Sequence, residues 1–497
     1  MSWKQAWGTV VAALLVATTL SCERDLGLGI DSVDYTTIET IVYSKHVQPL
    51  LSQKCATAGC HNASTAAEGL ALNSWESLMR GSENGAMIIP FRPEKSHIIF
   101  HLNTDSTIAP VALPTMPPAQ PLTHDELTFL MRWIQEGAKN DLDQVPFSDT
   151  PSGRVYVTNQ ADDEVSVVDV QSNLLMRMVS VGSLDNRVTP PESPHNIVID
   201  RQHLYYYVNL IVANEVWKYR VRDNAFIAKL NLGNKTSPAQ IALTPDGSTG
   251  YVSNFDPTGT NRSIQVFNTQ TMQITNRVAN DRIWAPHGVT MMHNGTTLWT
   301  ANQQSDNLCI VDTRATDEQT IIKVDPTVPD VPLGSPRFGP YQLVFTPDDR
   351  FAYVTCRFSN DVRVFDAQTR SLVASIPVGM NPLMLDISPD GRFVYVANRG
   401  GGTSPSKSVS VINTSLNREI QKIDDVGVDP HGIAVTSNGR YVYVSCENLG
   451  TPDAPHHPVS GLKTPGFVAV INAATNQVIA RIEVGAFAAG IAFVPSP

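Results

Sequence analysis

Residues 55–61, CATAGCH, bring two thiols and an imidazole together on a short stretch of chain. Cys55 and Cys60 are separated by four residues, and His61 directly follows the second cysteine. In covalent c-type haem attachment, two thiols add to the haem vinyl groups and such a histidine reaches the iron, usually with the spacing C-x-x-C-H. Gly59 lies where the longer C-x4-C-H loop must turn tightly. A disulfide, which needs no histidine, and a zinc half-site, which needs two more Cys or His ligands, are the alternatives.

A methionine in a proline-rich segment is the candidate for a second iron ligand. A His-ligated haem iron commonly takes a Met thioether on its other face, and Met116 lies in LPTMPPAQ, where prolines stiffen the backbone. His97 and His101, at i and i+4 in SHIIFHL, are rival ligands. A helix with a Thr123–Glu126 capping box is predicted after the methionine. Its apolar face is formed by Leu127, Leu130, Met131 and Ile134.

Residues 40–140 resemble the single-haem cytochrome c domain that is common in exported proteins of Planctomycetes and Bacteroidetes. The matching stretches, in order, are VQPLLSQKCATAGCHN, GLALNSWESLMRG, IIPFRPEKSHIIFHL, MPP and WIQEGA. The resemblance implies one covalent haem c on Cys55 and Cys60, with His61 as the proximal and Met116 as the distal iron ligand. The wide cysteine spacing is the departure from the family pattern. That pattern favours the methionine over the two rival histidines.

The rest of the chain repeats beyond a polar linker at residues 141–152. Similar segments start at Pro194, Pro238, Pro286, Pro340, Pro382, Pro430 and Ala488. A period of roughly 40 to 50 residues carrying four short strands is typical of propeller blades. The last start ends the chain without further strands, while three strand patterns at 154–182 precede the first start. We therefore expect a seventh blade built from both ends of the domain, which leaves no open sheet edge there.

The motif VYVTN at residues 155–159 matches the namesake of the YVTN family of β-propellers. The chain resembles that family from residue 152 to the end, and the resemblance implies a fold more than a function. The predicted fold class is therefore multidomain. A small all-α cytochrome c domain at 40–140 is followed by an all-β seven-bladed propeller at 153–497.

The second residue of each inner strand is expected to face the central channel of the propeller. Across the seven blades this position reads His195, Ala239, His287, Tyr341, Leu383, His431 and Ala489. Pseudo-symmetry points the three imidazoles at the axis at one height, and imidazoles are good ligands for zinc, copper or iron. The three histidines are a tentative hub site for an additional metal or a substrate. A packing and hydrogen-bonding role at the channel mouth is the alternative.

The N-terminal residues have the pattern of an export signal. Lys4 precedes an apolar run at residues 10–20 that is too short to span a membrane. Cys22 follows TLS and resembles the lipidated cysteine of a bacterial lipobox, although Thr19 stands where many lipoboxes have Leu. We expect a lipoprotein-type signal peptide at 1–21, lipidation of Cys22 and a tether at 22–39. This predicts a location in the periplasm or at the outer membrane or cell surface.

Composition and the remaining cysteines limit the other possibilities. The formal net charge is −11 with no clustered basic stripe, which argues against a nucleic-acid partner. Cys309, Cys356 and Cys446 are an odd number, so no complete disulfide framework is implied. Cys356 and Cys446 stand in the place of the motif asparagine, and we expect both to be small buried residues.

The function predicted from these features is electron transfer by a lipid-anchored c-type cytochrome. One covalent haem exchanges electrons with redox protein partners, and the propeller is a docking or scaffold domain. The first alternative is a redox enzyme whose hub substrate or metal exchanges electrons with the haem. The second is a surface-binding module. The sequence shows no hydrolytic triad, phosphate loop or dinucleotide fingerprint.

Overall fold

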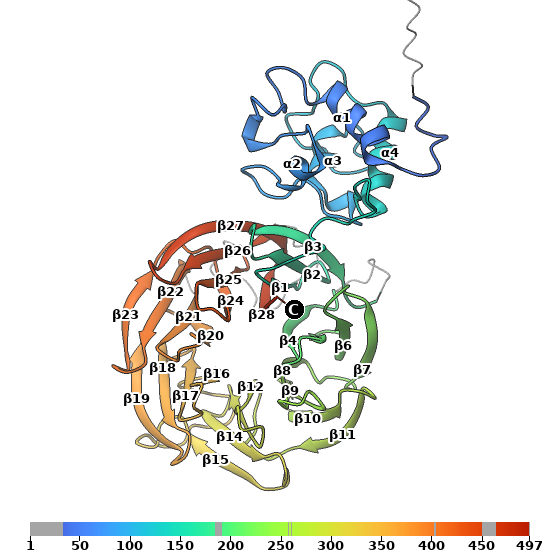
Figure 1. Ribbon diagram of the computed structural model, residues 1–497. Helices are drawn as coiled ribbons and strands as arrows, with labels where there is room; N and C mark the ends of the chain where they lie inside the picture. Colours follow the sequence, from blue (N-terminus) through green and yellow to red (C-terminus); the bar gives the residue numbers. More distant parts are fainter. Residues whose placement is uncertain are drawn as a thin grey trace, which may run out of the picture. The chain divides into compact units, whose positions relative to one another are not determined.

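The computed structural model describes residues 33–183, 191–256, 258–259, 261–401, 404–449 and 464–496. The predicted signal peptide and Cys22 lie outside these residues. Within these described residues, every helix lies between residues 43 and 135, and every strand lies between residues 154 and 494 (Figure 1). None of the helices described is long and apolar enough to cross a bilayer. The predicted order of a helical part followed by an all-β part is confirmed.

The helical part consists of short helices joined by long loops. They are a π-helical turn η1 (Tyr43–Val47), α1 (Gln48–Lys54), η2 (Ala67–Gly69), α2 (Trp75–Met79), η3 (Pro93–Lys95), α3 (His97–Leu102) and α4 (His124–Gln135). Helix α4 starts with the predicted capping box between Thr123 and Glu126. Met131 is only half-buried, and Phe129 and Trp133 join the buried face instead. The apolar face is therefore wider than the predicted stripe.

The all-β part is a ring of seven antiparallel four-stranded sheets (Figure 1). Blade one contains β4 (Pro194–Ile199), β5 (Tyr205–Leu210), β6 (Glu215–Arg220) and β7 (Phe226–Asn231). Blade two contains β8 (Pro238–Leu243), β9 (Thr249–Asn254), β10 (Ser263–Asn268) and β11 (Gln273–Val278). Blade three contains β12 (Pro286–Met291), β13 (Thr297–Asn302), β14 (Asn307–Asp312) and β15 (Gln319–Lys323). Blade four contains β16 (Pro340–Phe345), β17 (Phe351–Cys356), β18 (Asp361–Asp366) and β19 (Ser371–Pro377). Blade five contains β20 (Pro382–Ile387), β21 (Phe393–Gly401), β22 (Ser404–Asn413) and β23 (Arg418–Ile423). Blade six contains β24 (Pro430–Val435), β25 (Tyr441–Cys446), β26 (Pro465–Asn472) and β27 (Gln477–Ala486). The predicted seven blades are confirmed, and all seven predicted starts are the first residues of inner strands.

Both ends of the propeller contribute to its seventh blade. The blade contains β28 (Ala488–Val494), β1 (Arg154–Asn159), β2 (Glu164–Asp169) and β3 (Leu174–Ser180), in that order across the sheet. The register of the closing pair runs from Arg154 opposite Val494 to Asn159 opposite Ala488. Because this pairing joins the first strand to the last, the ring closes as predicted.

A left-handed residue precedes each inner strand and turns the chain into the channel. The seven residues, all with φ between 46° and 60°, are Ser193, Ser237, Ala285, Gly339, Asn381, Asp429 and Phe487. Only one of them is glycine, so six positions hold an L-residue in a backbone region that such residues rarely adopt. The same turn in every blade gives the second strand residue the same orientation toward the axis.

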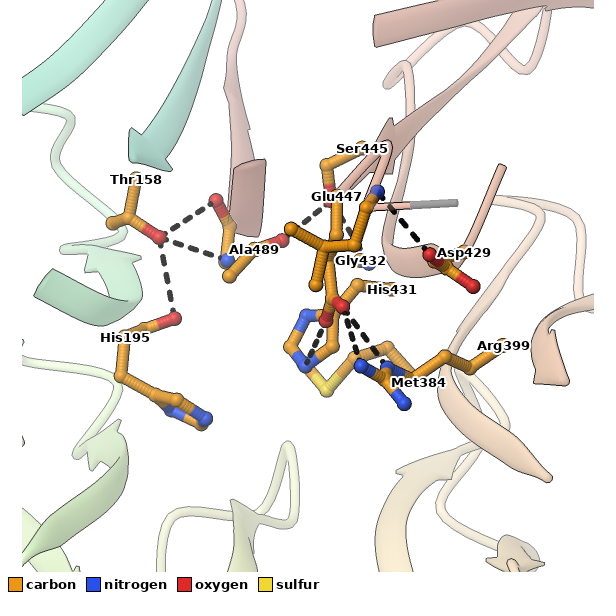
Figure 2. A network of polar contacts seen from close by, with 12 residues as sticks. Thr158, His195, Met384, Arg399, Asp429, His431, Gly432, Ser445, Glu447 and Ala489 are labelled. Atoms are coloured by element: carbon orange, nitrogen blue, oxygen red, sulfur yellow. Dashed lines mark hydrogen bonds and ion pairs between the residues drawn. The ribbon is translucent and has the colours of Figure 1, made fainter. Parts of the chain in front are cut away.

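Hydroxyl groups link neighbouring blades at the level of these second residues. Thr158 in β1 donates to the carbonyl of His195 in β4 at 3.2 Å, and Ser445 donates to the carbonyl of Ala489 (Figure 2). Ser253 makes the equivalent bond to the carbonyl of His287 at 2.6 Å. Each of these bonds joins the second strand of one blade to the inner strand of the next. They fix the backbones of His195, His287 and Ala489 to the adjacent blades.

Glycine follows the second residue in blades three, six and seven because the next blade comes close there. A Cβ added at Gly432 would lie 2.4 Å from the carbonyl oxygen of Ala489 and 2.7 Å from the Ser445 hydroxyl. A Cβ at Gly288 would lie 2.6 Å from the carbonyl oxygen of Tyr341. The glycine of the PHG motif is therefore required by blade packing.

We predict that Gly432→Ala destabilises the propeller. The added methyl group overlaps backbone that cannot move without opening a blade interface, and overpacking of this kind costs about 1–3 kcal/mol. Urea unfolding of the full chain, followed by far-ultraviolet circular dichroism, should show a lower midpoint. Gly401→Ala is the matched control, because the nearest atom to its Cβ lies at 3.9 Å. Equal midpoints for the two variants would contradict this account of the motif.

Candidate functional site

The CATAGCH segment folds back on itself directly after α1. The backbone N–H of His61 donates to the carbonyl of Cys55 at 3.3 Å, and that of Cys60 donates to Thr57 at 3.1 Å. Gly59 has φ +84°, and an added Cβ there would meet no atom within 4 Å. The glycine is thus needed for its backbone conformation and not for space. The loop brings the two cysteines and the histidine onto one compact turn.

The two thiols of this turn differ in their surroundings. Both cysteines are free, with Cys55 buried and Cys60 exposed. Burial raises the pKa of the Cys55 thiol to about 11, so the protonated thiol is its stable form. No group of three or more His, Cys, Asp or Glu side chains in the described ranges is arranged to hold a metal ion.

His61 has the hydrogen-bonding pattern of an oriented metal ligand. Its Nδ1 lies 3.3 Å from the carbonyl oxygen of Leu70, and its own carbonyl accepts from the N–H of Leu72 at 2.8 Å. When Nδ1 carries the proton and donates to a carbonyl, Nε2 keeps its lone pair for a metal. The segment after the turn therefore sets both the position and the tautomer of this imidazole.

Met116 lies on a loop that is bonded to the end of α3. Its N–H donates to the carbonyl of His101 at 2.7 Å, and the His101 ring nitrogen Nδ1 lies 3.1 Å from the carbonyl oxygen of Pro114. His97 begins the same helix, and its ring packs near Phe100 with centroids 5.6 Å apart. Both rival histidines thus lie on α3.

A single carboxylate joins α4 to the cysteine segment. Glu126 accepts from the Thr123 N–H at 2.8 Å within the capping box, and the same oxygen lies 3.5 Å from Lys54 Nζ. Lys54 directly precedes Cys55. Because the loop of Met116 leads into α4, this contact ties the two halves of the site together.

These residues fit a covalently bound haem c. They supply two thiols on one turn, a histidine whose Nδ1 is already engaged, and a thioether on a separate loop. This donor set is the one such a haem requires. That Cys55, Cys60, His61 and Met116 perform these roles remains a prediction.

The second candidate site lies at the hub of the propeller. The structure brings His195, His287 and His431 together, each at most 2% exposed. Ring centroids of His195 and His287 are 5.4 Å apart, and those of His195 and His431 are 5.8 Å apart. His195 Nδ1 lies 2.9 Å from the carbonyl oxygen of Ala239, and burial lowers the pKa of His195 to about 4. This imidazole is therefore neutral at physiological pH.

Sequence reasoning missed a buried ion pair beside these histidines. Glu447, fully buried, accepts from Arg399 Nε at 3.0 Å and Nη2 at 2.8 Å, and its other oxygen lies 4.0 Å from His431 Nε2 (Figure 2). Burial raises the pKa of Glu447 to about 7, although Arg399 acts in the opposite direction. The signal was present in the repeats, because the column after the strand motif reads Gln160, Ile211, Phe255, Gln303, Arg357, Arg399 and Glu447.

Another guanidinium and the Tyr341 ring adjoin the hub histidines. Arg357 Nε donates to the Asn381 amide oxygen at 3.1 Å, and its guanidinium lies 5.3 Å from the Tyr341 ring centroid. Tyr341 in turn stacks on His287 with centroids 3.7 Å apart. The hub thus holds imidazoles, guanidiniums and the carboxyl groups of Glu447 and Asp429 in a largely desolvated cluster.

A cavity of about 590 Å³ lies along the inner strands, where Gln240, Gln342 and Met384 are among its lining residues. Gln240 Nε2 lies 3.0 Å from the Met384 sulfur. The hub histidines meet as the repeats suggested, yet in the described ranges no group of three or more His, Cys, Asp or Glu side chains is arranged to hold a metal ion. A metal at the hub therefore remains a prediction.

The three cysteines of the propeller are buried, away from solvent. Cys309, Cys356 and Cys446 are free and 0% exposed. Burial raises the pKa of each thiol above its ordinary value. The prediction that Cys356 and Cys446 are small buried residues is confirmed.

Two family models match this chain. Residues 58–120 match the planctomycete cytochrome C model, a span that includes Cys60, His61 and Met116. Residues 147–336 and 324–451 match the model described as lactonase, 7-bladed beta-propeller. Together they support the predicted fusion of a cytochrome c domain with a propeller.

Similar proteins are found among curated sequences and solved structures. The hydrazine synthase subunit beta of Kuenenia stuttgartiensis is 28% identical over 221 residues, covering 36% of this chain and 54% of that protein. The chain thus spans about half the length of this relative. A functionally unknown protein from Desulfotomaculum acetoxidans is 14% identical with a TM-score of 0.52, covering 70% of this chain and 100% of that one. A structure of Kuenenia stuttgartiensis hydrazine synthase is 15% identical with a TM-score of 0.49, and the match covers 63% of this chain and 99% of that one. At 14% identity the Desulfotomaculum acetoxidans structure shows the fold alone.

We predict that Glu447 makes the propeller less stable as pH rises. Because its pKa is raised when folded, the folded chain keeps a proton that the unfolded chain has released. As pH rises from about 4.5 to about 7, the contribution of Glu447 to the free energy of unfolding therefore decreases, and above that range it is constant.

Glu447→Gln removes this titration and keeps an oxygen that can accept from Arg399. Relative to the variant, the wild type should lose about 2 kcal/mol of unfolding free energy between pH 5 and pH 8, measured by urea denaturation. Parallel pH profiles for the two proteins would show that Glu447 does not titrate in this range.

Proposed function

Because the chain belongs to the family described as lactonase, 7-bladed beta-propeller, and carries a planctomycete cytochrome c domain ahead of it, we propose that it is an exported cytochrome that transfers electrons through one covalent haem. The observation that carries the proposal is the folded CATAGCH turn, in which His61 is held by Leu70 through Nδ1. This arrangement leaves Nε2 for iron. The family match supports the same reading of the segment.

Each residue of the turn has a defined task in this proposal. Cys55 and Cys60 hold the haem through thioether bonds, and His61 and Met116 are its axial ligands. Bound there, a c-type haem supplies reversible one-electron transfer at its iron, with a potential that a methionine ligand raises. The Leu70 carbonyl accepts a hydrogen bond from the protonated Nδ1 of His61 and so fixes the orientation of the imidazole. The salt bridge between Lys54 and Glu126 keeps the proximal turn and α4 in register.

The propeller is proposed to be the docking or scaffold domain for a redox protein partner. One curated relative is, by name, a subunit of hydrazine synthase, which is consistent with a chain that works within a redox assembly. Propeller folds host many activities, so the fold itself does not select the partner.

We predict that denatured protein keeps its haem. Thioether bonds survive denaturation, so the chain should stain for haem on a denaturing gel, and Cys60→Ala should lose one of the two attachment bonds. Cys309→Ala is the control, since this buried thiol lies in the propeller. Wild-type haem that is extracted by acidic acetone would contradict covalent attachment.

The N-terminal anchor is tested separately. Lipidation of Cys22 should place the expressed protein in the membrane fraction, and Cys22→Ser should release it into the soluble exported fraction. Labelling with a fatty-acid analogue should follow the same pattern. An unlabelled wild type with the fractionation of the variant would overturn the anchor without affecting the haem proposal.

A second candidate function is a redox enzyme with a substrate or metal at the propeller hub. The observation that favours it is the convergence of His195, His287 and His431 beside the Glu447–Arg399 pair. Such a cluster can bind and orient a small polar substrate or ligate an ion.

If this second function holds, we predict that a hub metal copurifies in about one equivalent beyond the haem iron. Its binding should weaken at low pH, because an imidazole must be neutral to ligate a metal. Replacing His195 and His287 with Ala should remove it and leave the haem spectrum unchanged. Elemental analysis of the purified protein measures both metals. If the purified protein contains only haem iron, and the double variant has unchanged haem redox behaviour, the hub binds no metal. The electron-transfer proposal would then stand.

A further inference from the structure

The loop that carries Met116 has few backbone hydrogen bonds of its own. Prolines at positions 110, 114, 117 and 118 lack an N–H and cannot donate. Leu113 is 83% exposed, so burial contributes little to holding this part of the loop. The position of the thioether therefore depends on the contacts that the loop makes with neighbouring segments.

Three hydrogen bonds attach this loop to the last turn of α3. The N–H of Ala112 donates to the carbonyl of Phe100 at 2.8 Å, and the N–H of Met116 donates to the carbonyl of His101 at 2.7 Å. The third joins His101 Nδ1 to the carbonyl oxygen of Pro114 at 3.1 Å. His101 thus bonds the loop on both sides of Thr115, once with its backbone and once with its ring. Only the ring bond depends on the identity of this residue.

We propose that His101 is a positioning residue, which holds the loop so that the Met116 thioether faces the haem iron. The inference rests on the proposed function, in which Met116 is the distal ligand. A ring N–H directed at the Pro114 carbonyl supplies the donor that the prolines of the loop cannot supply. Losing it frees the loop to move, and the thioether then competes less well with other ligands for the iron.

His101 is also one of the rival distal ligands, and the two roles require different side-chain chemistry. A positioning role needs only an N–H donor near the place of Nδ1, which an asparagine Nδ2 provides. A ligating role needs the second ring nitrogen, which asparagine lacks. His101→Asn therefore separates the two roles, and His101→Asp is its matched control because it has nearly the same shape without an N–H donor.

The experiment uses the full-length holoprotein and four variants: His101→Asn, His101→Asp, His101→Leu and His97→Leu. Two readouts are compared at equal haem content, the near-infrared sulfur-to-iron charge-transfer band of the ferric protein and the imidazole concentration that half-displaces it. We expect wild type, His101→Asn and His97→Leu to behave alike. His101→Asp and His101→Leu should have weaker bands and half-displacement at roughly five- to tenfold lower imidazole, the range expected for one lost hydrogen bond.

The outcomes separate this inference from the proposed function. A wild type without the band overturns Met116 as the ligand. A wild type with the band, together with unchanged Asp and Leu variants, overturns only the positioning role of His101. Loss of six-coordinate haem in both the Asn and Asp variants would identify His101 as the ligand itself. If the Leu variant fails to assemble, the Asn and Asp pair still decides the question.

Discussion

Pairing between the last strand and the first strand of the propeller is the interaction on which the rest of the β structure depends. β28 hydrogen-bonds to β1, so the seventh sheet exists only when both ends of the domain are present. Closure then places Thr158 against the carbonyl of His195 in the next blade. Similar bonds recur at other interfaces, and glycine appears where the next backbone approaches too closely for a side chain. The hub geometry is therefore a consequence of ring closure.

The two candidate sites obey different physical rules. The CATAGCH turn that we propose to bind haem is local, because the proposed ligands lie within one small domain and the order of the turn comes from short-range backbone bonds around His61. The hub cluster is assembled from distant blades, and its chemistry is controlled by desolvation. Burial keeps His195 neutral and shifts Glu447 toward its protonated form, while Arg399 opposes that shift. A propeller of this kind can serve as a docking platform without using its hub, which is why electron transfer is the function we propose.

Much of the fold could be predicted because the sequence repeats. A proline at six of the seven inner-strand starts gave the blade positions, and the incomplete last repeat gave the closure. The capping box of Thr123 and Glu126 was equally readable, since it depends on residues three apart. The repeats align Arg399 and Glu447 in one column, but they do not predict that the two side chains pair, because a contact between two blades depends on how far each side chain reaches into the channel. The bond from His101 to Pro114 depends on the path of a loop without periodicity, so no pattern in the sequence indicates it.

The mass of the intact purified protein, followed by peptide mapping, tests the central claim most directly. The account predicts the mass of one haem in addition to the processed chain, carried by a single peptide that contains both Cys55 and Cys60. A chain at its unmodified mass, or a haem found on any other peptide, would contradict it.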